Sequence, residues 1–297
     1  MKTGMQRDMP YSHTAAEIAE VQALLIRSYG VSLKPFNWRS AVFENWIYAS
    51  RYLEPLEYFT KRVHLWRADT GELAAGVIRG THFTNVQISY AYRFLENEIF
   101  MWAEENLLDQ KPVISMVYDW DEERQELLKN RGYHEEGSIE DVRTYDLTRD
   151  YPPVALPSGY HFTTLAEYGN YAELIDLVNQ VWGMSLDEAW FRGKSTAPGY
   201  SLDRKLLVVS PQGRLAAYCL FWLYPDNKTA EIDPIGTHPD YRRRGLARAL
   251  VLESFRRMRE RSMRFAYIAS ETEDPVVSHL YASLQPIVTY QGCKWIR

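Results

Sequence analysis

The chain lacks several features that mark particular classes of protein. It has only two cysteines, Cys219 and Cys293, which are too few for a disulfide framework, and no Cys/His cluster has zinc-ligand spacing. No G-x-S-x-G segment marks a hydrolase nucleophile. The segment RGKST (192–196) is not a phosphate loop, because the pattern G-x-x-x-x-G-K-[ST] would require glycine at position 188, where Glu188 stands. The sequence therefore gives little support to the hypothesis of a hydrolase or a metalloenzyme, and we expect no bound metal.

Long hydrophobic runs are also missing. No stretch of about 18 apolar residues occurs, and the first residues do not form an apolar signal segment. We therefore expect a soluble, cytoplasmic protein with no membrane partner. The composition, with 46% hydrophobic and 25% charged residues, is that of a globular protein, and 297 residues suit two domains of about 150 residues.

Positive charge is scarce except in one segment. Residues 241–264 contain nine arginines and two glutamates, whereas the whole chain has a net charge of −5. Because the remainder is acidic, we expect no general nucleic-acid binding, which needs a broad basic face. A local basic patch suits a small polyanion, and the alternative is a solvated helix face.

The clearest break in the periodic pattern is TRDYPPVALPSGY (148–160), which holds three prolines and a glycine. We place the boundary between two domains there, as residues 1–150 and 151–297. These two ranges are called the N-terminal half and the C-terminal half below.

The pattern of the C-terminal half predicts the order β-α-βββ-α-β-α-ββ. Its three central strands form an antiparallel meander, and Pro234 interrupts the third strand because proline has no N–H to donate. A long helix is expected at about 242–262, followed by the buried strand 264–270. Asp274 is expected to cap the next helix, and two short strands are expected to close the chain.

The stretch THPDYRRRGLARAL (237–250) places three arginines and a glycine at the start of the long helix. A helix N-terminus offers unpaired N–H groups and a positive dipole end, so it binds phosphate well when no side chain blocks the approach. Gly245 removes that obstruction, and the small side chain of Ala247 permits a close approach. The loop is thus suited to a pyrophosphate group.

These residues resemble a known family. Arg242-Arg243-Arg244-Gly245-Leu246-Ala247 is similar to the [Q/R]-x-x-G-x-[G/A] signature of the GNAT superfamily, the acyl-CoA-dependent N-acyltransferases. The resemblance implies two tandem domains of α/β (α+β) class, each with a mixed, mostly antiparallel sheet flanked by helices. It implies acetyl-CoA as cosubstrate, with its pyrophosphate on this loop. It also implies that the main chain at Ile235, Gly236 and Thr237 holds the acetyl and pantetheine groups.

The same resemblance implies catalytic roles. Glu231, on the strand that enters the interruption, would be the general base, and Asp233, on the same strand face, would be the alternative base. A surface Glu in a cross-strand ion pair is the competing interpretation of Glu231. Tyr281 would protonate the leaving thiolate, since HLYASLQPI is similar to the family's LYxxxGF stretch, although Gln285 and Pro286 replace the Gly-Phe pair. The competing interpretation of Tyr281 is a buried tyrosine with a satisfied hydroxyl.

The N-terminal half shows the same order of strands and helices, and LLKNRGY (127–133) also resembles the family. Aligning YRFLENE with YRRRGLA sets Arg93 against Arg242, but it places Glu96 at the glycine position and Glu98 at the alanine position. Carboxylates there should repel a phosphate. We expect a degenerate copy with a structural or substrate-shaping role.

The expected activity is transfer of an acetyl group from acetyl-CoA to an amine of a small molecule or peptide. Two alternatives remain: a protein that senses acyl-CoA without turnover, and a nucleic-acid- or anion-binding regulator that uses the arginine helix. The aromatic segment 37–59 either lines an acceptor groove or packs in the core. The identity of the acceptor, and whether the chain forms a homodimer, are left open by the sequence.

Overall fold

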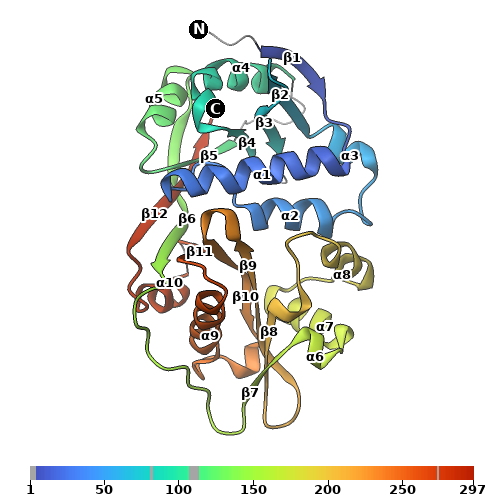
Figure 1. Cartoon of the computed structure of the whole chain (residues 1–297), viewed down its shortest axis with the longest axis vertical. Helices are drawn as coiled ribbons and strands as arrows, with labels where there is room; N and C mark the ends of the chain where they lie inside the picture. Colours follow the sequence, from blue (N-terminus) through green and yellow to red (C-terminus); the bar gives the residue numbers. More distant parts are fainter. Residues whose placement is uncertain (1–4, 81–82, 107–113, 273) are drawn as a thin grey trace.

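The computed structural model describes residues 5–80, 83–106, 114–272 and 274–297. Figure 1 shows an elongated molecule with the N-terminal half at the top and the C-terminal half at the bottom, and with helices α1 and α2 crossing between them. The linker segment 148–160 contains no helix or strand. The boundary at residue 150 stays a prediction, because the two halves share a sheet.

The N-terminal half follows the order predicted for it. Its elements are β1 (Met5–Pro10), α1 (Ala15–Ser32), α2 (Ser40–Ala49), α3 (Leu56–Thr60), β2 (Val63–Ala68), β3 (Leu73–Arg79), β4 (Thr84–Ile88), η1 (Tyr90–Leu95), α4 (Glu96–Asn106), β5 (Ile114–Tyr118), α5 (Glu122–Asn130) and β6 (His134–Asp146). Strands β2 and β3 form an antiparallel hairpin, and Gly71 supplies the positive φ of its turn. Residues 107–113, where the sequence predicts a helix end and a strand start, lie outside the described residues.

The C-terminal half contains the expected meander and two α-helices that were not expected, α6 and α8. Its elements are β7 (His161–Thr164), α6 (Leu165–Tyr168), α7 (Tyr171–Trp182), α8 (Glu188–Ser195), η2 (Leu202–Arg204), β8 (Lys205–Val209), β9 (Leu215–Tyr224), η3 (Pro225–Asn227), β10 (Thr229–Thr237), η4 (Pro239–Tyr241), α9 (Leu246–Glu260), β11 (Phe265–Glu271), α10 (Pro275–Ala282) and β12 (Val288–Ile296). Helix α8 contains most of the RGKST segment.

Three local predictions can be compared with these bounds. Asp274 caps α10 as expected, accepting hydrogen bonds from two backbone N–H groups. Helix α9 begins at Leu246, later than predicted, because Arg243 and Gly245 have positive φ and cannot continue a right-handed helix. The two closing strands are a single strand, β12, whose pairing with β6 shifts register after Gly292.

The strands form two sheets that do not follow the division into halves. Strands β1 to β4 form a four-stranded sheet in sequence order, and the other sheet has eight strands in the order β5-β12-β6-β11-β10-β9-β8-β7. The C-terminal strand β12 lies between β5 and β6, and β6 pairs with β11. Strand β6 of the N-terminal half thus pairs with a strand of the C-terminal half, and strand β12 of the C-terminal half lies between two strands of the N-terminal half. Figure 1 shows β6 and β12 running between the halves.

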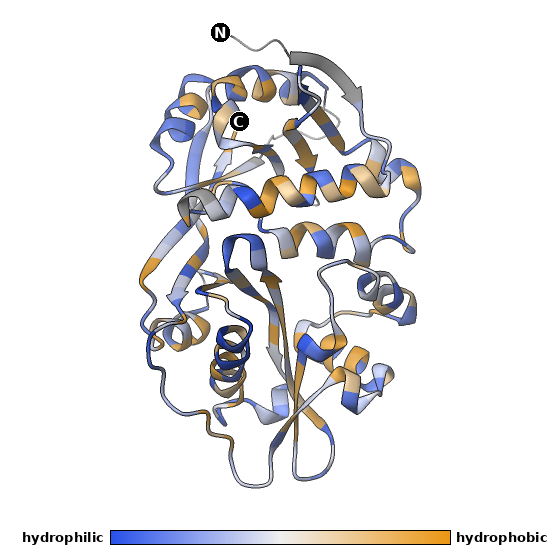
Figure 2. Cartoon of the chain, in the orientation of Figure 1, coloured by the Kyte–Doolittle hydropathy of each residue, from blue (hydrophilic) through white to orange (hydrophobic). Residues whose placement is uncertain are grey.

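Helices cover both faces of the C-terminal part of the large sheet. On one face, Cys219 and Phe221 of β9 pack with α9 and α10 around a core that includes Leu250. On the other face, Tyr218 packs with α7 and with Phe191 of α8. Figure 2 shows β9 as largely hydrophobic and α9 as largely hydrophilic along its outer side, as expected for a strand buried on both faces beside an amphipathic helix.

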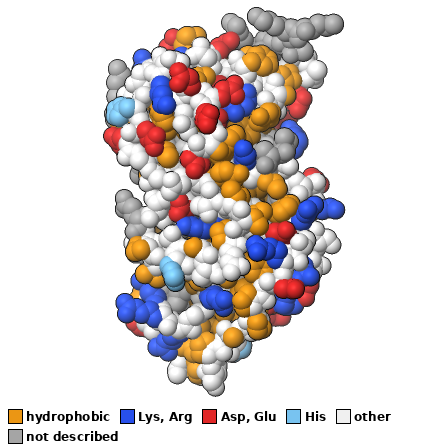
Figure 3. All heavy atoms as spheres, turned by 90° about the vertical axis from the view of Figure 1, so that its left-hand side faces the viewer, with side chains coloured by type: hydrophobic (Ala, Val, Ile, Leu, Met, Phe, Trp, Pro, Cys, Tyr) orange, Lys and Arg blue, Asp and Glu red, His pale blue; other side chains and the backbone are white. Residues whose placement is uncertain are grey.

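Charge is distributed unevenly over the surface. On the face shown in Figure 3, most Asp and Glu side chains lie in the upper part, over the N-terminal half, and Lys and Arg side chains gather in the lower part. Among the described residues, no helix is long and apolar enough to cross a membrane. No group of three or more potential metal ligands occurs within the described ranges.

Candidate active site

The site begins where two parallel strands part. Strands β10 and β11 are paired from Thr229 to Ile232, with Ile232 opposite Ile268. Beyond that point β10 follows the cis peptide bond between Asp233 and Pro234, and its pairing with β9 shifts register. The predicted interruption at Pro234 is therefore confirmed.

The residues expected to hold the acetyl and pantetheine groups lie beyond this interruption. Ile235, Gly236 and Thr237 remain paired with β9, but no described residue of β11 pairs with them. Because one edge of β10 is paired and the other is open here, backbone N–H and C=O groups are left to bind an extended amide. The binding role expected for these residues stays a prediction.

The arginine–glycine loop follows η4 and leads directly into α9. Gly245 is the N-cap residue, with φ of 77°, and no side chain caps the helix. The N–H groups of the first turn therefore have no intrahelical partner. An added Cβ at Gly245 would meet no described atom within 4 Å, so the chain itself needs glycine there for its backbone conformation.

The three arginines of this loop are exposed, and none forms an ion pair with a described residue. Arg242 Nε donates to the Thr237 carbonyl at 3.3 Å. Arg244 donates to the Tyr160 hydroxyl at 2.8 Å and to the Asp240 carbonyl at 3.1 Å. Since all of these acceptors are neutral, the positive charges of the loop are not compensated locally and favour an anionic ligand.

Glu231 is completely buried and is held by residues from both halves. Its carboxylate accepts a hydrogen bond from Arg39 Nη1 and another from the Tyr224 hydroxyl at 3.1 Å. Burial raises the pKa of Glu231 to about 7, against the lowering effect of Arg39. The interpretation of Glu231 as a surface residue in a cross-strand ion pair is therefore wrong, because its ion pair is buried and joins the halves.

Asp233 lies beside Glu231 but is more accessible. Its side chain is 26% exposed, Arg39 Nη1 is 4.0 Å from its Oδ2, and Asn45 Nδ2 donates to the same oxygen at 3.2 Å. The structure thus brings the two predicted carboxylates together around one guanidinium group. Of the two, Asp233 is the one that a ligand can reach.

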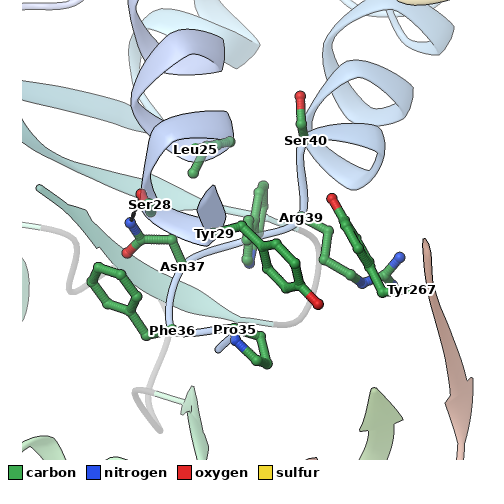
Figure 4. A pocket seen from close by; sticks show the side chains of 10 residues that line it. Leu25, Ser28, Tyr29, Pro35, Phe36, Asn37, Arg39, Ser40 and Tyr267 are labelled. Atoms are coloured by element: carbon green, nitrogen blue, oxygen red, sulfur yellow. Dashed lines mark hydrogen bonds between the residues drawn. The ribbon is translucent and has the colours of Figure 1, made fainter. Parts of the chain in front are cut away.

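Arg39 and Asn45 were not predicted from the sequence. Arg39 immediately precedes α2, and its Nη2 also donates to Glu140 Oε2 at 3.1 Å. Figure 4 shows Arg39 extending toward Tyr267, with Tyr29 nearby, at the edge of a cavity of about 10 Å³ between α1, α2 and the sheet. The carboxylates of Glu140 and Glu231 keep the pKa of the buried guanidinium raised although burial opposes this.

Tyr281 lies on α10 and is almost completely buried. Its backbone carbonyl accepts from the Tyr145 hydroxyl at 2.9 Å, whereas its own hydroxyl makes no hydrogen bond with a described residue. Burial, followed by the charges of Cys219 and Asp233, raises its pKa. The competing interpretation, a tyrosine with a satisfied hydroxyl, is not supported among the described residues.

The corresponding place in the N-terminal half is closed by an ion-pair cluster. Glu96, the first residue of α4, accepts from Arg93 Nε at 2.9 Å and from Arg124 Nη2 at 2.8 Å, and all three side chains are buried. Arg93 also donates to Asp121 at 2.6 Å. Glu98 is only partly buried. The carboxylate of Glu96 thus stands at the position that corresponds to Gly245, where the C-terminal loop is expected to bind a phosphate.

The aromatic segment 37–59 serves mainly in packing. Phe43, Ile47 and Phe59 belong to a buried core with α1, and Trp38, Trp46 and Tyr58 pack against it. The same segment also supplies Asn45, which donates to Asp233, and the interpretation that the segment lines an acceptor groove stays a prediction.

Comparisons with known proteins show a family match for part of the chain and similar structures for the whole of it. Residues 171–284 match the model of the acetyltransferase (GNAT) family. A GCN5-related N-acetyltransferase from Sphaerobacter thermophilus has a similar structure, with 18% identity, a TM-score of 0.62, and coverage of 98% of this chain and 94% of that chain. A tandem GNAT protein from the clavulanic acid biosynthesis pathway has 16% identity, a TM-score of 0.62, and coverage of 99% and 98%.

A GNAT-family acetyltransferase from Colwellia psychrerythraea is also similar in structure, with 7% identity, a TM-score of 0.60, and coverage of 99% of both chains. No curated protein gave a significant sequence match. The likeness of the structures shows the fold over the whole chain, and the family model adds the match in the C-terminal half. Together they show that the whole chain shares the fold of tandem GNAT proteins and that residues 171–284 match the GNAT family model.

Proposed function

We propose that the chain is an acetyl-CoA-dependent N-acetyltransferase whose C-terminal half binds the coenzyme and carries out the reaction. The observation that carries the proposal is the meeting of an open strand edge, an uncapped arginine-rich helix start and a reachable carboxylate, Asp233, at one place. The first two features suit acyl-CoA, and the third suits an amine. The family match over residues 171–284 supports this assignment.

Different groups of the chain would bind the pyrophosphate and the pantetheine arm of the coenzyme. The free N–H groups at the start of α9 and the guanidinium groups of Arg242, Arg243 and Arg244 would hold the pyrophosphate. The open edge at Ile235, Gly236 and Thr237 would align the pantetheine arm and the acetyl carbonyl. N–H groups at that edge would also stabilise negative charge on the thioester oxygen. Leu246 and Ala247 complete the close approach of helix and loop.

The acceptor amine must lose a proton, because an alkyl ammonium has a pKa near 10. Asp233 is positioned to take that proton, directly or through a water molecule, since it is the accessible carboxylate of the pair. Glu231 is fully engaged by Arg39 and Tyr224. We therefore assign Glu231 a positioning role, in which it fixes Arg39 and, through Arg39, Asp233.

The remaining step concerns the leaving thiolate. As the amine nitrogen bonds to the thioester carbon, the carbon–sulfur bond breaks and the thiolate needs a proton. Tyr281 has a hydroxyl without a hydrogen-bond partner among the described residues and lies close enough to Asp233 for that charge to affect its pKa. We assign it as the proton donor, with acetylated amine and free CoA as the products.

The test compares D233N, E231Q and Y281F with D240N, a control at a carboxylate whose side chain is 84% exposed. Free thiol released from acetyl-CoA is followed with a panel of amines, and the Kd for CoA is measured separately. We expect D233N to lower kcat by about 100-fold or more, E231Q and Y281F to lower it by about tenfold, and all four variants to keep the wild-type Kd. A larger loss in E231Q than in D233N would make Glu231 the base.

One observation favours a second candidate, a protein that binds acyl-CoA without turnover: Glu231 is locked in a buried ion pair, as a structural residue would be. This candidate predicts that acetyl-CoA binds but that no amine releases thiol. It also predicts that D233N behaves like D240N in every assay.

A further inference from the structure

Two lysines of the C-terminal half are buried beside the candidate active site. Lys194, in the last turn of α8, is 5% exposed, and Lys205, the first residue of β8, is 2% exposed. Lysine is rarely buried to this extent unless its charge is paired. Neither ammonium group forms an ion pair or a hydrogen bond with any residue that the structure describes.

Their contacts within the chain are aromatic. Lys205 Nζ lies 4.0 Å from the centre of the Tyr218 ring, and Lys194 Nζ lies 5.4 Å from that of Trp190. Cation–π contacts offset only part of the cost of burying a charge. Burial lowers the pKa of Lys194 to about 8, and burial together with the charge of Lys194 lowers the pKa of Lys205 further. The pair is therefore short of negative charge.

Tyr218 connects these lysines to the open part of β10. It stands opposite Gly236 in the β9–β10 register, and a Cβ added at Gly236 would lie 3.0 Å from its ring. Trp182 Nε1 donates to the Tyr218 hydroxyl at 2.6 Å. Lys205 stands opposite Leu220, two residues from Tyr218, so both side chains project from the same sheet face.

This face is the one covered by α7 and α8, whereas α9 and its arginine loop cover the other. A ligand here would thus approach β10 from the side opposite to α9. Asp233 is near enough for its charge to act on both lysines, yet it lies beyond ion-pair distance of either. Asp233 and two buried lysines that have no counter-ion among the described residues therefore lie near enough for their charges to interact.

We propose that Lys194 and Lys205 bind a carboxylate of the acceptor, so that the acceptor is a compound carrying both an amine and a carboxylate, of the amino-acid class. This inference rests on the proposed function, because it takes from it that the amine of the acceptor is acetylated. The carboxylate of the acceptor provides the negative counter-ion that the two lysines lack, and the ammonium group of the acceptor lies toward Asp233. The reaction joins the amine nitrogen to the acetyl carbon, breaks the carbon–sulfur bond, and gives an N-acetyl amino acid, CoA and a proton.

The experiment uses matched pairs of ligands with the full chain. Each proteinogenic amino acid is compared with its α-amide, which keeps the amine and removes the negative charge. Binding is measured by calorimetry and thermal stabilisation in the presence of CoA, and turnover by release of free thiol from acetyl-CoA. The variants are K194M and K205M, which keep an apolar stem of similar length, and K228M at an exposed lysine serves as the control.

We expect at least one amino acid to bind the wild type and K228M more tightly than its amide, by about tenfold or more. In K194M and K205M this preference should fall to about one, through a higher Kd and KM for the acid, while the Kd for CoA and the binding of the amide stay unchanged. A lysine with a merely structural role would weaken acid and amide equally. That result, or equal binding of acids and amides by the wild type, would overturn the proposal.

The two proposals fail in different ways. Lysine-dependent binding of an amino acid without any thiol release would support the carboxylate subsite while rejecting the transferase. Turnover of neutral amines at full rate in both lysine variants, with no preference for acids, would keep the transferase and reject the subsite.

Discussion

Residues 92–98 and 241–247 occupy corresponding places in the two halves, between a central strand and the helix that follows it. In the C-terminal half the chain turns through Gly245, no side chain caps the start of α9, and three exposed arginines form no ion pair with any described residue. In the N-terminal half η1 runs directly into α4, and the carboxylate of Glu96 is bound by two buried arginines. The C-terminal copy leaves its helix start open to the anionic ligand that we propose, whereas in the N-terminal copy the side chain of Glu96 provides the anion.

The gap between the central strands differs in the same way. In the N-terminal half β4 and β5 belong to different sheets, and residues of the segment 35–38 form hydrogen bonds with β4. Asn37 donates to the Ile88 carbonyl at 2.8 Å and accepts from its N–H at 3.0 Å. The Phe36 carbonyl accepts from Arg124 Nη1 at 2.6 Å. In the C-terminal half no described strand pairs with Ile235, Gly236 and Thr237 on the side of β11, and Arg242 Nε donates to the Thr237 carbonyl at 3.3 Å.

This difference shows how a second copy of a fold can support the first. Because segment 35–38 is anchored in the N-terminal gap, the next residue, Arg39, is delivered to Glu231 across the boundary between the halves. The exchange of β6 and β12 fixes the same boundary through backbone pairing. The N-terminal half then acts as a scaffold that completes the site of its neighbour.

The most severe test of the comparison gives the C-terminal loop the residue of its counterpart. G245E places a carboxylate and a long side chain at the anion site and strains a backbone with φ of 77°. We expect the Kd for CoA to rise by about 1,000-fold, or about 4 kcal/mol. G245A, which adds only the backbone strain of about 1–2 kcal/mol, should raise it about tenfold.

The control for G245E is the unfolding temperature without CoA, which should fall by about as much as in G245A, because both substitutions add the same backbone strain and a Cβ there meets no described atom. Thermal stabilisation by CoA and calorimetry give the affinity. Unchanged affinity in G245E would mean that the coenzyme does not use this loop, and the assignment of the two halves would have to be reconsidered.

The second test removes the internal anion. E96Q leaves Arg93 and Arg124 buried beside a neutral amide, and we expect a loss of about 3 kcal/mol of unfolding free energy. The Kd for CoA, measured at a temperature at which the variant is folded, should not change. Glu104→Gln, at a less buried carboxylate paired with Arg131, should cost less.

The pH dependence of E96Q sharpens this prediction. Although burial acts to raise it, Arg124 and Arg93 keep the pKa of Glu96 below its ordinary value. A carboxyl group with a lowered pKa in the folded state stabilises the protein above its unfolded pKa, and this contribution is lost as the pH falls. The difference between wild type and E96Q should therefore shrink in acid unfolding experiments. A difference that is constant with pH would contradict the ion-pair explanation.

Local chemistry explains which features the sequence predicts. The proline at 234, the cap at Asp274 and the glycine turn before α9 each act on neighbouring residues, so short patterns carry them. The same holds for the carboxylates Glu231 and Asp233, which lie two residues apart on one strand. These predictions needed no knowledge of the remainder of the chain.

The residues that were missed reach the site through tertiary structure. Arg39 is 192 residues from Glu231, and no motif surrounds it. Lys205 begins a strand that reads as apolar, and its burial follows from packing against Tyr218. The pairing of β12 with β5 and β6 was missed for the same reason. The residue pattern of β12 is that of an ordinary strand and does not indicate that its partners belong to the N-terminal half.

The smallest of the three effects concerns the segment that fills the N-terminal gap. N37A leaves the N–H and C=O of Ile88 without their partner in a buried place, and the loss should be about 2 kcal/mol in urea unfolding. N130A, at an exposed asparagine, is the matched control. Because Asn37 also anchors the segment that carries Arg39, N37A should lower kcat while leaving the Kd for CoA unchanged. If stability fell but kcat did not, the gap-filling segment would be a structural element of the N-terminal half alone, and Arg39 would be held by its carboxylates without help from the scaffold.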